Sequence, residues 1–196
     1  MSAFTLIEIP GPLSDAPFPT ESMSVDGLEV VRVEGPAEPQ RVTVGGFVAQ
    51  TALQLHRRVG EGPLALLGHG LAGPFLPALA QTQRVAGRAV TGYVFVDALL
   101  PRPGGGTLRE LLAAPSGLED AGLERTGVSA TLEAPVLDQR LPPAPDWPDA
   151  PCGFVQTAQR SPVAGREFWA RSAARRDWAV GNTVEEVLRM MPGLLA

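Results

Sequence analysis

The stretch "GPLALLGHGLAGPFLPAL", from Gly62 to Leu79, decides the fold. The apolar run Leu64–Leu67 is typical of a buried strand, and a glycine-rich turn follows it directly. We expect a helix after the turn that continues to about Gln83. A buried strand followed at once by a helix is half of the unit that builds parallel sheets. The centre of the turn is Gly70.

The rest of the chain repeats this alternation of strands and helices. Strands are predicted, from apolar and β-branched runs, over Phe4–Pro10, Leu28–Gly35, Gly92–Ala98, 152–158 and 177–180, the last as a short edge strand. Helices are predicted over Thr43–Val59, 161–176 and Val184–Leu195, and the segment 11–27 is predicted to be a loop with at most one helical turn. The fold class is therefore α/β, an open and mostly parallel sheet of about six strands flanked by helices.

The segment from about residue 101 to 150 breaks the pattern. It contains "RPGGG" and "LPPAPDWPDAP", with weak helical periodicity around Leu108–Leu112 and Leu118–Leu123. Proline and glycine at this density favour a short lid or cap rather than sheet. We therefore expect a single domain over residues 1–196 that carries a lid.

Composition excludes several classes of function. The net charge of −5 and the pI of about 5.1 argue against binding to nucleic acid or to an anionic membrane. All 16 basic residues are arginine, which excludes Schiff-base chemistry on lysine and suggests a GC-rich, actinobacterial coding sequence. One cysteine and two histidines cannot form a Cys/His metal cluster, and we expect no metal and no cofactor. The lone cysteine and the lack of a long apolar run predict a cytoplasmic protein.

The turn Gly68-His69-Gly70-Leu71-Ala72-Gly73 resembles the "GHSxAGP" elbow of small actinobacterial α/β-hydrolases. The segments "FTLIEIPGPLSDAPF", "GYVFVDALLPRPGG", "PDAPCGFVQ" and "WAVGNTVEEVLRMMPGLLA" are similar to other parts of that family. The likeness covers most of the chain and is weakest in the lid. The chain is identified as a degenerate member, because Gly70 stands where the resemblance places the nucleophilic serine.

The resemblance also locates the other catalytic groups. Counting back from Pro192 places the family's histidine at Glu185, and the segment "QTAQRS", where an acid is expected, contains no carboxylate. Asp97 is the remaining candidate for the acid. Since serine–histidine hydrolysis needs a nucleophile, a base and an orienting acid in contact, we expect that mechanism to be lost. Asp97 and Glu185 are instead predicted as general acid or base.

Backbone donors do not depend on the missing side chains. The resemblance assigns an oxyanion hole to the amide of Leu71 and to one amide of the first loop, where Gly11 and Leu13 are the candidates because Pro12 has no N–H. Gly70, His69 and Trp147 complete the expected ligand site. For His69 and Trp147, packing in the core is the alternative interpretation. Cys152 is interpreted as an inert buried thiol.

Three functions are compatible with these residues. The first is a non-hydrolytic isomerase, cyclase or epimerase that acts on a small natural-product intermediate, such as a polyketide. The second is a pseudo-hydrolase that binds a ligand or a protein without turnover. The third is a hydrolase in which Asp97 or Glu185 activates water. We expect a small-molecule partner, no nucleic acid and no membrane, and a homodimer is left open.

Overall fold

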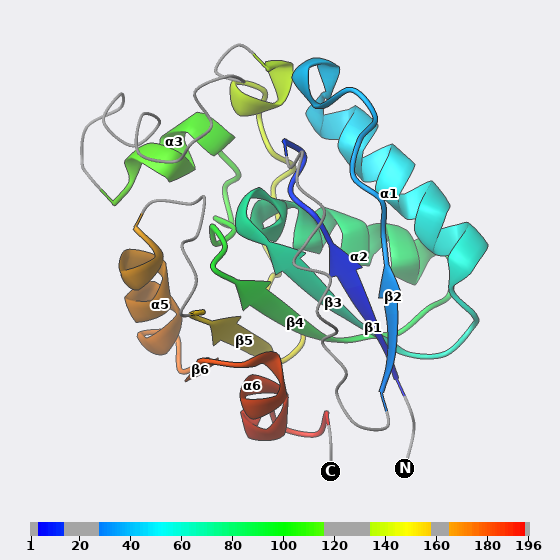
Figure 1. Cartoon of the computed structure of the whole chain (residues 1–196), viewed down its shortest axis with the longest axis vertical. Helices are drawn as coiled ribbons and strands as arrows, with labels where there is room; N and C mark the ends of the chain where they lie inside the picture. Colours follow the sequence, from blue (N-terminus) through cyan, green and yellow to red (C-terminus); the bar gives the residue numbers. More distant parts are fainter. Residues whose placement is uncertain (1–3, 14–27, 116–133, 158–164, 195–196) are drawn as a thin grey trace.

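A computed structural model describes residues 4–13, 28–115, 134–157 and 165–194. Six strands form one sheet in which every neighbouring pair is parallel (Figure 1). In spatial order the strands are β2 (Glu29–Arg32), β1 (Thr5–Ile9), β3 (Leu64–His69), β4 (Val90–Val96), β5 (Cys152–Val155) and β6 (Ala179–Gly181). The predicted fold class is confirmed, and β6 is the short edge strand that was expected.

Helices cover both faces of the sheet. They are α1 (Val44–Arg58), α2 (Leu76–Val85), α3 (Leu108–Ala113), α5 (Arg166–Ala174) and α6 (Val184–Met190), with short 3-10 helices η1 (Pro39–Arg41), η2 (Gly70–Phe75) and η4 (Pro135–Leu137). In Figure 1, α1 runs beside the β2 edge, and α5 and α6 lie at the β6 end. Among the described residues, no helix is long and apolar enough to cross a membrane.

Alternation along each strand divides the core into two layers. On β3, Leu64 and Leu66 pack with α1, α2, α3 and α5, whereas Ala65 and Leu67 pack with α6. Both sets are fully buried. Strands that are apolar on both faces are what a parallel sheet covered by helices requires.

The ends of α1 follow from its sequence. The hydroxyl of Thr43 accepts a hydrogen bond from the Gly46 N–H at 3.0 Å, which satisfies one free donor of the first turn. His56, Arg57 and Arg58 lie in the last turn, where positive charge is favourable. On the buried side, Phe47 packs edge-on against Phe75 with ring centroids 4.7 Å apart.

Three predicted helices differ from the structure. The helix expected over 161–176 is α5, which begins only at Arg166 because its N-cap is Gly165 with φ 74°. The last helix was expected to reach Leu195, but α6 ends at Met190 and Met191 is extended (ψ 123°). The cause is Pro192, because a proline disfavours helical backbone in the residue before it. The helix after the central turn begins as 3-10 in η2 and becomes α-helical only from Leu76.

The described parts of the expected lid belong to the main core. Leu108, Leu111, Val136 and Leu137 are fully buried and pack in the same cluster as the helices α1 and α2. An antiparallel bridge joins Gly106 to Leu141 across this segment. The helix predicted around Leu118–Leu123 lies outside the described residues.

Gly73 marks the tightest backbone contact of the fold. A Cβ atom at Gly73 would lie 2.1 Å from the carbonyl oxygen of Leu99, where no side chain fits without moving the backbone. At Gly45 in α1, a Cβ atom would meet nothing within 4 Å. The two glycines therefore form a matched pair for testing how the elbow is packed.

We expect Gly73→Ala to lower the free energy of unfolding by roughly 2 kcal/mol or more, because the extra methyl forces a backbone shift. Gly45→Ala is expected to leave the stability unchanged or to raise it by up to about 1 kcal/mol, because alanine favours the helix. Urea unfolding followed by circular dichroism measures both. Equal stability of the two variants would contradict the packing described here.

Candidate functional site

The turn between β3 and η2 has the geometry of a strand-to-helix elbow. Gly70 at its apex is buried and has φ 52°, in the left-handed region that favours glycine. A Cβ atom at Gly68 would lie 3.1 to 3.2 Å from the side chain of Leu76. Small residues are therefore needed on both sides of the apex, as the sequence indicated.

Pro74 explains why the elbow helix begins as 3-10. In an α-helix the Gly70 carbonyl would accept a hydrogen bond from residue 74, but proline has no N–H. The Leu99 N–H donates to the Gly70 oxygen instead, at 3.0 Å. This bond fixes the apex of the elbow to the loop after β4.

Gly11 and Leu71 lie against each other, as the predicted pair of oxyanion donors requires. A Cβ atom at Gly11 would lie 3.6 Å from the Leu71 amide nitrogen and 3.5 Å from the Leu71 Cβ. The loop after β1 therefore runs along the amide side of the elbow. Leu13, the alternative donor, is partly buried and packs against the core. The donor roles of these residues stay predictions.

Asp97 lies just beyond the carboxyl end of β4 and is buried. Its backbone has φ 44°, an uncommon conformation for a residue other than glycine that tends to occur at functional sites. Its Oδ1 accepts a hydrogen bond from the Thr157 N–H at 3.1 Å, and its Oδ2 accepts one from the Thr157 hydroxyl. Asp97 is two residues before Leu99, whose N–H donates a hydrogen bond to the Gly70 oxygen. Asp97 therefore lies at the same end of the sheet as the elbow.

Glu185 lies on the exposed surface of α6. Its carboxylate pairs with Arg189 one turn further along the helix. The neighbouring Glu186 accepts a hydrogen bond from the Asn182 N–H at 2.8 Å, and Thr183 caps the helix. Asn182 and Thr183 are the residues that connect β6 to α6. The catalytic role of Glu185 stays a prediction.

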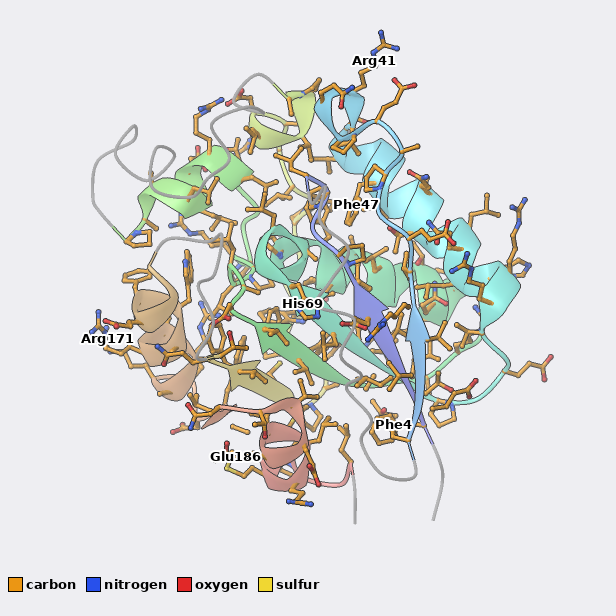
Figure 2. All side chains as sticks on the ribbon, viewed as in Figure 1. Phe4, Arg41, Phe47, His69, Arg171 and Glu186 are labelled. Atoms are coloured by element: carbon orange, nitrogen blue, oxygen red, sulfur yellow. The ribbon has the colours of Figure 1, made fainter. Side chains whose placement is uncertain are left out.

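A group of three charged or titratable side chains, with a buried glutamate between two partly exposed partners, adjoins the elbow. The Oε1 of Glu8 on β1 lies 3.1 Å from the Nε2 of His69 on β3, and its Oε2 accepts a hydrogen bond from the Nε of Arg32 on β2. Figure 2 labels His69, the last residue of β3, near the middle of the view. Only 3% of the Glu8 side chain is exposed. His69 is therefore paired with a carboxylate and is not simply packed among apolar groups.

The partners of Glu8 keep it ionised. Burial acts to raise the pKa of Glu8, but the hydrogen bonds from His69 and Arg32 outweigh burial and hold the pKa below its ordinary value of 4.5. An ionised carboxylate can only accept hydrogen bonds, so the Nε2 of His69 carries a hydrogen and donates it.

The sequence analysis missed Glu8 and Arg32. The available signal was a glutamate within the apolar strand "TLIEI", because a buried carboxylate needs a charged or hydrogen-bonding partner. The sequence did not identify the partner.

Trp147 lies in an aromatic cluster over the middle of β4. Its ring packs edge-on against Tyr93, Phe95 and Trp178 at centroid distances of 5.8, 5.9 and 5.4 Å. Its Nε1 is buried and has no hydrogen-bond partner in the part of the chain that the structure describes. These contacts place Trp147 in the core layer beside α2 and α5, and its predicted role in ligand binding stays untested.

Two further groups bear on the chemistry of the site. Burial raises the pKa of the Cys152 thiol, with the nearby Asp149 acting in the same direction, so this thiol resists ionisation. Within the described residues, no group of three or more His, Cys, Asp or Glu side chains is placed to hold a metal ion.

Comparison with solved structures identifies the fold. The chain is similar to the type II thioesterase BorB from the borrelidin biosynthetic cluster, with 21% identity, a TM-score of 0.53, and coverage of 93% of this chain and 83% of that one. It is also similar to ClbQ from the colibactin NRPS/PKS pathway, with 14% identity, a TM-score of 0.55 and coverage of 93% and 87%. The chain has an α/β-hydrolase-like fold. At this level of identity the likeness concerns the fold alone.

Comparison of sequences adds one relative. A stretch of 105 residues is 30% identical to the non-reducing polyketide synthase men2 of Menisporopsis theobromae. The stretch covers 54% of this chain and 5% of the length of that protein. No model of a known protein family matches the chain.

We expect the purified protein to lack ordinary esterase activity, because Gly70 has no side chain that could attack an ester. Turnover of p-nitrophenyl acetate should equal that of a heat-inactivated control, and a fluorophosphonate probe should not label the protein. Gly70→Ser is expected to stay inactive, because among the described residues no histidine is shown in contact with position 70, and His69 is paired with Glu8 instead. Strong esterase activity of this variant would show that another group, such as Asp97, activates the new hydroxyl.

The Glu8 carboxylate is expected to stabilise the fold in a pH-dependent way. Its pKa is lower in the folded state than its ordinary value of 4.5, so the folded state binds fewer protons and the contribution is complete above that value. As pH falls through the folded pKa, the contribution is lost. The difference in unfolding free energy between wild type and Glu8→Gln should therefore be larger at about pH 6 than at about pH 3. An equal difference at both values would contradict the assigned ion pair.

Proposed function

We propose that the chain is a non-hydrolytic enzyme of natural-product biosynthesis, of the isomerase, epimerase or cyclase type. It binds the carbonyl oxygen of a small acyl or polyketide intermediate between Gly11 and the Leu71 amide. The observation that carries the proposal is the elbow itself, which keeps its backbone geometry around a glycine apex.

The backbone groups support chemistry that needs no nucleophile. An N–H aimed at a carbonyl oxygen stabilises the negative charge that develops when a proton leaves the neighbouring carbon. The resulting enolate can take up a proton at the same carbon or at a conjugated one, giving an epimer or an isomer. Alternatively, the enolate carbon attacks a second carbonyl of the same molecule, giving a ring.

Asp97 is the proposed base. Its carboxylate takes the proton from the carbon next to the bound carbonyl and returns the proton to the product, so that no atoms are gained or lost. The buried position and the strained backbone of Asp97 support this assignment. Thr157 holds the carboxylate in place with two hydrogen bonds.

The comparisons support the substrate class. ClbQ is named for an NRPS/PKS pathway, men2 is named as a polyketide synthase, and BorB is named for the borrelidin biosynthetic cluster. Intermediates of this chemical class carry carbonyl groups next to acidic C–H bonds, which suits proton transfer at an oxyanion site.

Thioester hydrolysis is the second candidate function, and the thioesterase name of BorB favours it. Without a serine at position 70, the reaction would need a water molecule activated by a carboxylate such as Asp97. The same substrate distinguishes the two functions, because hydrolysis releases a carboxylic acid and proton transfer does not.

We expect the protein to exchange the C2 hydrogen of a 3-oxoacyl N-acetylcysteamine thioester in D2O faster than buffer does. Gly11→Ala should slow this exchange roughly a hundredfold, because its methyl would lie 3.6 Å from the Leu71 nitrogen, in the proposed position of the carbonyl oxygen, and the loss of one oxyanion donor has about that effect. Gly45→Ala is the matched control and should exchange like wild type. Mass spectrometry follows deuterium uptake and acid release together. Acid release would favour the thioesterase, and binding without either reaction would favour a ligand-binding protein.

Asp97→Asn is expected to lower the exchange rate by at least about a hundredfold, because the amide keeps the shape of the carboxylate but takes up no proton. We expect a smaller loss for Glu185→Gln, since that carboxylate is exposed and paired with Arg189. Circular dichroism checks that both variants fold. If both keep the wild-type rate, catalysis depends on the backbone donors alone.

A further inference from the structure

A trio made of buried Glu8 and its partly exposed partners Arg32 and His69 joins the ends of three adjacent strands. The trio takes one residue each from β1, β2 and β3, separated in sequence by 24 and 61 positions from Glu8. All three lie on the α6 side of the sheet, because each follows a residue of that layer (Leu6, Val30 or Leu67) by two positions, and residues two apart in a strand share a face.

Stability alone does not explain this arrangement. A carboxylate buried in a sheet loses its hydration, and well-packed apolar residues of similar size often serve the fold equally well. Each Glu8 oxygen has a partner of its own, one on each neighbouring strand. The trio therefore helps to fix the spacing and the register of β1 relative to β2 and β3.

The trio is close in sequence to both segments of the oxyanion site. Gly11 follows Glu8 by three residues, and Leu71 follows His69 by two. A Cβ atom at Gly11 would lie 3.7 Å from the His69 carbonyl oxygen and 3.6 Å from the Leu71 nitrogen. The contact between Glu8 and His69 thus joins the two strands immediately before the point where their loops meet.

We infer that Glu8 and His69 are positioning residues that set the spacing between Gly11 and the Leu71 N–H, with Arg32 holding the second oxygen of Glu8. The effect on catalysis rests on the proposed function, whereas the effect on the spacing of the two loops does not. The ligand concerned is the carbonyl oxygen of the acyl intermediate. A misplacement of about 1 Å at a catalytic group can cost a hundredfold in rate. Loss of the correct spacing between Gly11 and the Leu71 N–H would therefore lower kcat.

Substitution of His69 separates positioning from packing. His69→Leu removes the bond to Glu8 while keeping an apolar side chain, and His69→Gln keeps an N–H that can reach Glu8. In the exchange assay we expect His69→Leu to lower kcat roughly tenfold or more with little change in KM, and His69→Gln to recover most of the loss. Glu34→Gln, which breaks the exposed pair with Arg58, is the matched control and should behave like wild type.

A second measurement does not depend on activity. The backbone amide signals of Gly11 and Leu71 in a heteronuclear NMR spectrum should move in Glu8→Gln, although neither residue neighbours Glu8 in sequence, and should stay in place in Glu34→Gln. If Glu8→Gln fails to fold, Arg32→Gln loosens Glu8 from its half-exposed partner and serves the same purpose.

The outcomes separate the inference from the proposed function. If wild type shows no exchange but the Gly11 and Leu71 signals respond to Glu8, the proposed function is wrong and the positioning role stands. If wild type exchanges and folded His69→Leu keeps its kcat, or if both signals stay in place in folded Glu8→Gln, the positioning role is wrong. Equal loss in His69→Leu and His69→Gln would also overturn it, because the hydrogen bond would then not matter.

Discussion

The close approach of η2 to the loop after β4 is the constraint on which the site depends. There is no room for a side chain between Gly73 and the Leu99 carbonyl. The Gly70 oxygen accepts a hydrogen bond from the Leu99 N–H, because Pro74 has no N–H to donate. These two contacts seat the elbow helix on the sheet. They also bring Asp97, two residues before Leu99, to the same end of the sheet as the apex. A bulkier residue at position 73 would separate the elbow from the strand that carries the acid.

The neighbourhood of the elbow is built from backbone and from one buried charge. Backbone groups at Gly11, Gly70 and Leu71 line the proposed site. Glu8, three residues before Gly11 on β1, has one partner on each neighbouring strand. The proposed oxygen donors are backbone groups, so they do not depend on a side chain at the apex. This explains how a chain with glycine at position 70 can keep the shape of an elbow.

A fold shared with thioesterases does not assign a reaction to this chain. The same sheet and elbow support attack by a serine, activation of water or proton transfer, and only side chains distinguish these reactions. Here the distinguishing residues are Gly70, which has no side chain, and Asp97, which is buried and held by Thr157. The proposal of a non-hydrolytic enzyme depends on these two positions.

The sequence by itself determined the order of strands and helices and the position of the elbow. Apolar runs and helical spacing are local properties, and the glycines at 68, 70 and 73 mark a tight turn in the sequence. Only the tertiary structure decided which side chains meet. The apolar pattern of β1 placed Glu8 on a buried face. Its partners, Arg32 and His69, are 24 and 61 residues away in sequence. The periodicity of one strand carries no information about which residues of neighbouring strands lie beside it. For the same reason, the count from Pro192 could not tell that Glu185 faces solvent and pairs with Arg189.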